Sequence, residues 1–189
     1  KYGHFYDEVD LFPIPGRTGA NCTGVSIGGF EISSGSYIVA MNTIDHSLVT
    51  EYTSYEMVGI ELEQRDILIC SLPKGDFNKE HVKQTTLARY AGSEKIGSIP
   101  QLVKVSDDTM MVLWQEFSIC GVPEAVKYAF IDGNGEACSE TETLENYRLS
   151  VCKPIISGNS VVWYANEYGV RRFYTIPLTD NGLFSQEKN

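Results

Sequence analysis

The chain has 189 residues, and its 25 acidic against 15 basic side chains give a formal net charge of −10. This length fits one ordinary domain or two small ones, and the 42% hydrophobic content is too high for a disordered chain. The negative charge disfavours nucleic acid and anionic membrane surfaces as partners, because both are themselves negative.

The sequence predicts connecting segments at the two ends of the chain. Residues 1–24 predict an extended arm or linker, since Pro13 and Pro15 precede Gly16 there. Residues 181–189 form a polar tail, and we expect the chain to be a piece of a larger protein. No uncharged stretch is longer than the thirteen residues of 32–44. Crossing a bilayer takes about 20 apolar residues, so we expect no membrane insertion.

Three stretches share one pattern: an apolar strand, a tight turn of Ser, Gly, Asp or Asn, and a second apolar strand. They are 30–41, 101–114 and 153–164. Such turn residues accept the backbone angles of tight hairpins, so each stretch predicts a β-hairpin. A run rich in β-branched or aromatic residues follows each hairpin and predicts a further strand. These runs are 66–72, 126–132 and 172–178.

Antiparallel units of three or four strands that recur along a chain are typical of β-propeller blades. We therefore predict an all-β domain over 25–180, with about three propeller-blade-like antiparallel repeats at approximately 25–76, 82–138 and 149–180. A β-sandwich is the alternative fold. Because propellers close with four to eight blades, three blades imply either further blades outside this stretch or a homodimer.

The sequence of the last two repeats resembles propeller-type repeats of large surface or secreted bacterial proteins. The resemblance rests on the segments IPQLVKVSDDTMMVLWQEF, VKYAFIDGNGE and CKPIISGNSVVWYANEYGVRRFYTIPL, and it covers about 25–180. It implies an extracellular or cell-surface location. It transfers no catalytic residue to this chain.

Five cysteines are present, and their spacing contains no CxxC pair. A structural zinc site is therefore disfavoured. An odd number leaves at least one thiol unpaired, so we expect free thiols, with a Cys120–Cys138 bridge as the alternative.

Aromatic side chains gather in the last two repeats and are the main binding candidates. Exposed Trp and Tyr rings stack on sugars and anchor protein interfaces. We expect ligand contacts from Tyr168, Trp163, Tyr164 and Trp114. Trp114 and Trp163 end the same strand of their repeats, however, and this equivalence also favours burial between blades.

Glu116 and Glu167 follow the two tryptophans and are the candidates for catalytic acids. A propeller-type glycoside hydrolase needs two such carboxylates close together. The alternative interpretation, which we favour, is that both are solvent-facing acids of an acidic protein and that the chain has no catalytic residue.

Asp132, Asn134 and Glu136 place oxygen ligands at alternate positions, as at the start of a calcium-binding loop. The acid expected at the twelfth position is replaced by Thr143. The Asp-Gly-Asn-Gly sequence therefore predicts a hairpin turn first and a weak calcium site second. No other cofactor is expected.

These features predict a non-catalytic binding or interaction module of a larger extracellular or surface bacterial protein, in contact with a glycan or a protein. One alternative is a fragment of a glycoside hydrolase that uses paired carboxylates. The other is a scaffold segment that has no ligand.

Overall fold

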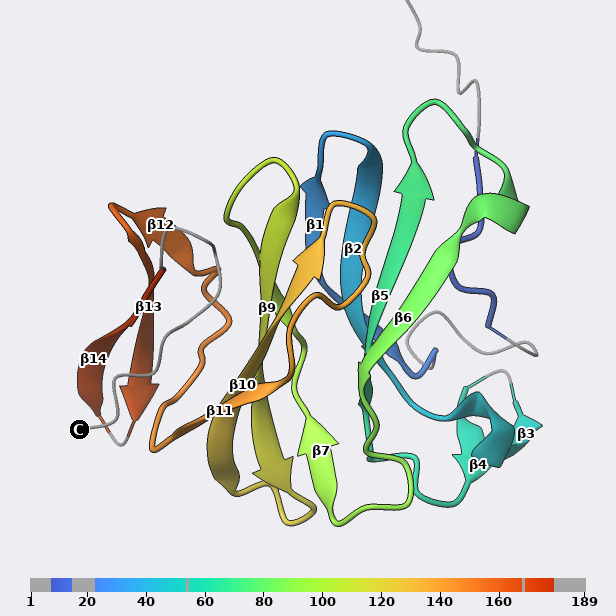
Figure 1. Ribbon diagram of the computed structural model, residues 1–189. Coiled ribbons are helices and arrows are strands. Elements are labelled where there is room, and N and C mark those ends of the chain that lie inside the picture. Colours follow the sequence, from blue (N-terminus) through green and yellow to red (C-terminus); the bar gives the residue numbers. More distant parts are fainter. Residues whose placement is uncertain (1–7, 15–22, 54, 168, 179–189) are drawn as a thin grey trace, which may run out of the picture.

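The computed structural model describes residues 8–14, 23–53, 55–167 and 169–178. Within these residues the regular structure is β-strand, apart from two 3₁₀ turns at His46–Leu48 and Lys79–His81 (Figure 1). The all-β prediction is therefore confirmed. None of the described residues belongs to a helix with the length and apolar character needed to span a membrane.

The first sheet is antiparallel and has the strand order β1-β2-β5-β6. Its strands are β1 (Val25–Ile32), β2 (Ser36–Thr43), β5 (Asp66–Pro73) and β6 (Lys83–Ala88). A two-stranded ribbon is inserted between β2 and β5. It consists of β3 (Val49–Tyr52) and β4 (Met57–Gly59).

The second sheet is built around the longest hairpin of the described chain, β9–β10. β11 pairs with β10, while the short strands β7 and β8 pair with opposite ends of β9. The strands are β7 (Lys95–Gly97), β8 (Gln101–Lys104), β9 (Thr109–Ser118), β10 (Pro123–Asp132) and β11 (Glu142–Glu145).

The third sheet has the order β12-β13-β14 and is also antiparallel. Its strands are β12 (Ile155–Ser157), β13 (Ser160–Glu167) and β14 (Val170–Pro177). All three predicted hairpins, and the strand predicted after each of them, are therefore confirmed. One boundary needs correction: the segment 83–88, which we assigned to the second repeat, pairs with β5 in the first sheet.

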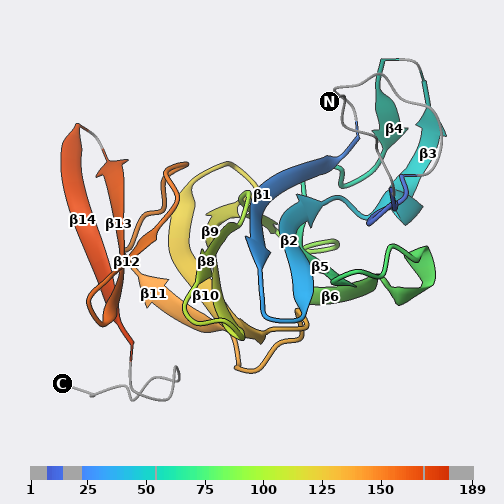
Figure 2. The ribbon, with the colours of Figure 1, turned by 90° about the horizontal axis from the view of Figure 1, so that it is seen from above.

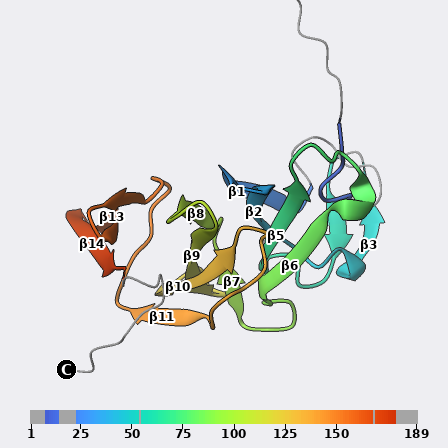
Figure 3. The ribbon, with the colours of Figure 1, turned by 45° about the horizontal axis from the view of Figure 1, so that its top comes forward.

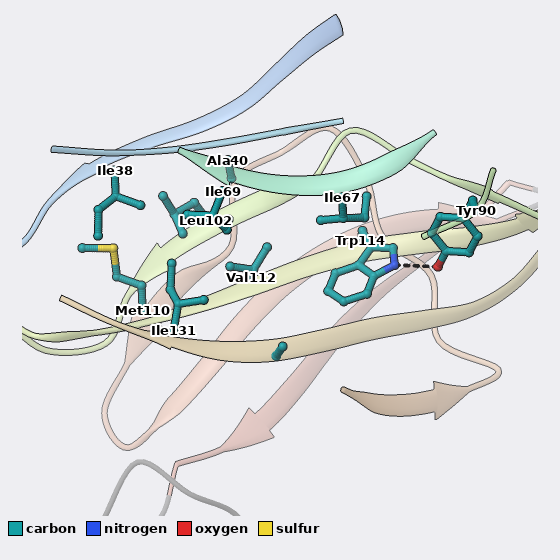
Figure 4. Packing of buried hydrophobic residues seen from close by; sticks show 11 residues of the cluster. Ile38, Ala40, Ile67, Ile69, Tyr90, Leu102, Met110, Val112, Trp114 and Ile131 are labelled. Atoms are coloured by element: carbon teal, nitrogen blue, oxygen red, sulfur yellow. Dashed lines mark hydrogen bonds between the residues drawn. The ribbon is translucent and has the colours of Figure 1, made fainter. Parts of the chain in front are cut away.

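The three sheets pack face to face, with the second sheet in the middle (Figures 1 and 2). Side chains alternate across a strand, and β9 uses both of its faces. Met110, Val112 and Trp114 enter the core shared with the first sheet, and Met111 and Leu113 enter the core shared with the third. Figure 4 shows the first of these cores. The middle sheet is thus covered on both sides.

The first and second sheets approach each other most closely at β1 and β8. β1 contacts β8 (Figures 2 and 3), and glycines make this approach feasible. A Cβ atom on Gly28 would lie 1.8 Å from the carbonyl oxygen of Pro100. Across the stack, Lys153, which precedes β12, forms an ion pair with Glu31 on β1. β1 therefore lies near both β8 and the segment before β12, although no strand pairing among the described residues joins the third sheet to the first.

We predict that Gly28→Ala lowers the free energy of unfolding by about 1–3 kcal/mol or more, because the added methyl group overlaps the Pro100 backbone. Urea unfolding measures the change. Gly35→Ala is the matched control, since no atom lies within 4 Å of a Cβ built on Gly35. Equal stability of the two variants would contradict the close β1–β8 contact.

Candidate functional site

The two tryptophans are core residues, and the prediction that they contact a ligand is wrong. Trp114 has 0% of its surface exposed and Trp163 has 3%. The indole Nε1 of Trp114 donates a hydrogen bond to the hydroxyl of Tyr90 at 2.8 Å (Figure 4). The indole Nε1 of Trp163 donates to the carbonyl oxygen of Arg148 at 2.7 Å. Both side chains face the preceding sheet, as their equivalent positions in the repeats suggested.

The two tyrosine candidates have different outcomes. Tyr168 lies outside the described residues. Tyr164 is half-buried on the face of β13 opposite to Trp163. Its ring centroid is 5.8 Å from that of Phe173 on β14. Tyr164 is therefore part of a surface rather than of the core between sheets.

Glu116 is buried inside a polar network and does not face solvent, in contrast to our interpretation. Its Oε1 atom lies 2.8 Å from Nζ of Lys95, and its Oε2 atom accepts a hydrogen bond from the Tyr90 hydroxyl at 3.0 Å. The hydrogen bond to Glu116 raises the pKa of Lys95, and burial raises the pKa of Tyr90. Tyr90 therefore stays protonated and links Trp114 to the carboxylate.

Glu167 is held by two arginines at the end of β13. Its carboxylate lies 2.9 Å from Nε of Arg148 and 3.0 Å from Nη1 of Arg172. Glu116 points to the first-sheet side of the second sheet, whereas Glu167 lies in the third sheet. The structure does not bring these two carboxylates together, so they do not form the pair that a glycosidase mechanism requires.

The segment 132–136 has the geometry of a hairpin turn. Oδ1 of Asp132 accepts hydrogen bonds from the backbone N–H groups of Asn134 and Glu136, at 2.8 and 2.9 Å. Gly135 has φ of 81°, which glycine adopts readily. The Glu136 carboxylate lies 3.1 Å from Nζ of Lys83. These contacts explain the sequence of the turn without calcium.

Metal-ligating and thiol groups are dispersed over the described residues. No group of three or more His, Cys, Asp and Glu side chains in this part of the chain is arranged to hold a metal ion. Cys70, Cys120, Cys138 and Cys152 are free, so the alternative Cys120–Cys138 bridge is wrong. Burial raises the pKa of Cys70 to about 11, which keeps this thiol protonated and unreactive near neutral pH.

A groove with a volume of about 620 Å³ lies between β6 of the first sheet and the segment that follows β10. Small and polar side chains line it. They are Thr86, Leu87, Ala129, Ala137, Cys138, Ser139, Glu140 and Thr141. These lining residues include no histidine or lysine that would activate the hydroxyl or thiol groups as nucleophiles.

The third sheet exposes an apolar outer face. Val161, Trp163 and Ala165 point to the core, so the alternate residues of β13 point away from it. We call the residues on this side the third-sheet outer face. They are Ile155, Val162, Tyr164 and Phe173, which strand pairing places beside each other. Ile155 on β12 is 61% exposed and Phe173 on β14 is 77% exposed, on either side of the central strand β13.

The opposite end of the stack has a second apolar surface, the first-sheet outer face. It includes Ile27, Phe30, Ile32, Tyr37 and Phe77. The Phe30 and Tyr37 rings are stacked with centroids 6.3 Å apart, and Phe77 lies 6.2 Å from Tyr37. Leu11 and Phe12 cover the centre of this face, above a cluster formed by Val39, Met41, Leu68 and Cys70.

We did not predict these two faces from the sequence. β13 contains a signal, because apolar residues occupy both of its faces, and such a pattern predicts burial on both sides. On β1 the apolar residues lie on the outer face, while Gly29 and Glu31 are on the side of the second sheet. Neither pattern indicates that the terminal sheets lack a neighbour.

Comparisons of this chain with protein-family models, with curated proteins and with solved structures gave no match. The fold therefore defines the class of this protein by itself: an all-β protein of three antiparallel sheets that pack face to face.

We predict that Tyr90→Phe lowers the free energy of unfolding by about 1–3 kcal/mol, because it removes the hydroxyl that bonds to both Trp114 and Glu116. Urea unfolding with tryptophan fluorescence measures the loss. Tyr37→Phe, on the half-exposed first-sheet outer face, is the control and should change stability by less than about 0.5 kcal/mol. A Tyr90 variant as stable as this control would contradict the network.

Proposed function

We propose that the chain is a non-catalytic interaction module of a larger extracellular or surface protein, and that its three sheets are propeller-type blades. The observation that carries the proposal is the pair of apolar outer faces at the two ends of the stack. A protein partner covers these faces in the functional assembly.

The blade interpretation is supported by the repeated construction of the sheets. Each contains an antiparallel hairpin, β1–β2, β8–β9 or β12–β13, whose second strand pairs with one further strand, β5, β10 or β14. The second and third sheets place a tryptophan on the second strand of this hairpin, against the preceding sheet. The close approach of β1 and β8 agrees with blades that converge at their inner strands.

A binding function is supported by the composition and exposure of the outer faces. Monomeric proteins rarely expose continuous apolar surface of this kind, and such surface commonly marks an interaction site. Catalysis receives no comparable support, since Glu116 and Glu167 are neutralised by basic neighbours in different parts of the fold.

A protein partner fits these faces better than a glycan does. Sugar rings stack mainly on exposed Trp and Tyr, and both tryptophans are buried. The most exposed side chains of the two faces are instead Ile27, Phe30, Ile155 and Phe173. Aliphatic and phenylalanine side chains of this kind form the cores of protein interfaces.

The test is a binding screen of the immobilised chain against a displayed library of protein fragments and against a glycan array. We expect protein fragments that bind the wild-type chain and bind Phe30→Asp or Phe173→Asp at least tenfold more weakly. Val122→Asp is the matched control, because Val122 is exposed in the β9–β10 turn, away from both faces. Glycan binding without protein binding, or glycoside turnover that Glu116→Gln abolishes, would contradict the proposal.

A further inference from the structure

We infer that the partner of the outer faces is a second copy of this chain, with the third-sheet outer face of each copy on the first-sheet outer face of the other. This inference rests on the proposed function and specifies its partner. Two copies would then form a closed ring of six sheets.

The internal packing of the chain provides the template for this contact. The second sheet receives the first sheet on one face and the third sheet on its other face. We call the face of a sheet that points to the preceding sheet its front face, and the face that points to the following sheet its rear face. Every internal contact therefore joins the rear face of one sheet to the front face of the next. The third-sheet outer face is a rear face and the first-sheet outer face is a front face. A head-to-tail contact between copies continues the same arrangement.

The first-sheet outer face has room for a partner sheet, because the N-terminal residues Leu11 and Phe12 cover only part of it. Leu11 and Phe12 lie over the β2 and β5 residues of this face. Ile27, Phe30 and Ile32 on β1 remain 40–60% exposed. Since β1 also makes the closest contact between the first and second sheets, through β8, the uncovered row on β1 is where a neighbouring sheet would make its tightest contact.

Charge also favours the head-to-tail orientation. Residues 45–63, which include the β3–β4 ribbon, contain five acidic side chains and neither lysine nor arginine. This segment follows the end of β2. Arg171 is exposed on the third-sheet outer face, paired in register with Asn166 at the end of β13. Figure 1 shows the ribbon and the end of β13 at the same lower end of the stack. Docking of the two faces would bring Arg171 toward the acidic segment.

The curvature of the stack agrees with closure by two copies. The β1–β8 contact and the Lys153–Glu31 ion pair draw β8 and the segment before β12 toward β1, on one side of the stack. Two copies supply six sheets, within the range of four to eight that closed propellers use. The two contacts are identical and related by a two-fold axis, so the assembly closes and does not grow into a filament.

The experiment is light scattering with size-exclusion chromatography on the wild-type chain and on two variants. We expect the wild type at twice the chain mass of 21.0 kDa, and Phe30→Asp and Phe173→Asp each at the mass of one chain. A mixture of the two variants should regain a one-to-one complex. In that mixture, the intact third-sheet face of one variant meets the intact first-sheet face of the other.

A control variant and a test of folding separate loss of the interface from loss of the fold, and a third variant tests the charge contact. Val122→Asp should retain the wild-type mass, and circular dichroism should show that every variant is folded. Arg171→Glu, which changes only an exposed side chain, should weaken self-association about tenfold at low salt.

Three results would overturn the inference: a wild type that stays at one chain mass, variants that still associate, or variants that separate but do not recover when mixed. The last result indicates contact between like faces. If the wild type stays at one chain mass but the fragment screen yields binders that Phe173→Asp weakens, only the identity of the partner is wrong. If both experiments fail, the proposed function is wrong.

Discussion

The structure depends on the burial of its second sheet on both faces. β9 and β10 supply alternate residues to two separate cores, so the same two strands hold the first sheet on one side and the third on the other. The terminal sheets do not share this arrangement, because each has a neighbouring sheet on only one face. Apolar residues lie on both faces of β13, and on β1 they lie on the outer face. In both terminal sheets the stack ends before another sheet covers these outer faces.

The hairpins and the positions of the tryptophans were predictable from the sequence because they depend on local signals. Tight-turn residues between apolar strands determine each hairpin, and equivalent placement of Trp114 and Trp163 indicates equivalent burial. The boundary after the first repeat was not predictable in the same way. β6 has no buried residue and is mostly polar, and a 3₁₀ turn rather than a tight turn precedes it. No local signal therefore attaches β6 to β5, although backbone pairing does so in the fold.

The candidate site was less predictable than the fold, because its contacts join residues that are distant in sequence. The sequence around Glu116 predicts a surface acid. Its burial depends on contacts with Tyr90 and Lys95, which lie 26 and 21 residues earlier in the chain. Phe30 and Phe173 are strand residues by every local measure. Only the order of the sheets shows that both lie on the outside of the stack. The functional interpretation accordingly moves from the tryptophans to the faces at the two ends.

Amide hydrogen exchange followed by mass spectrometry tests the central claim most directly. If the second sheet is the structural centre, the amides of β9 and β10 should exchange last, through unfolding of the whole domain. The amides of the first sheet should exchange earlier, since that sheet has one fully covered face and its partly exposed outer face opens more easily. First-sheet amides that outlast those of β9 and β10 would contradict the account.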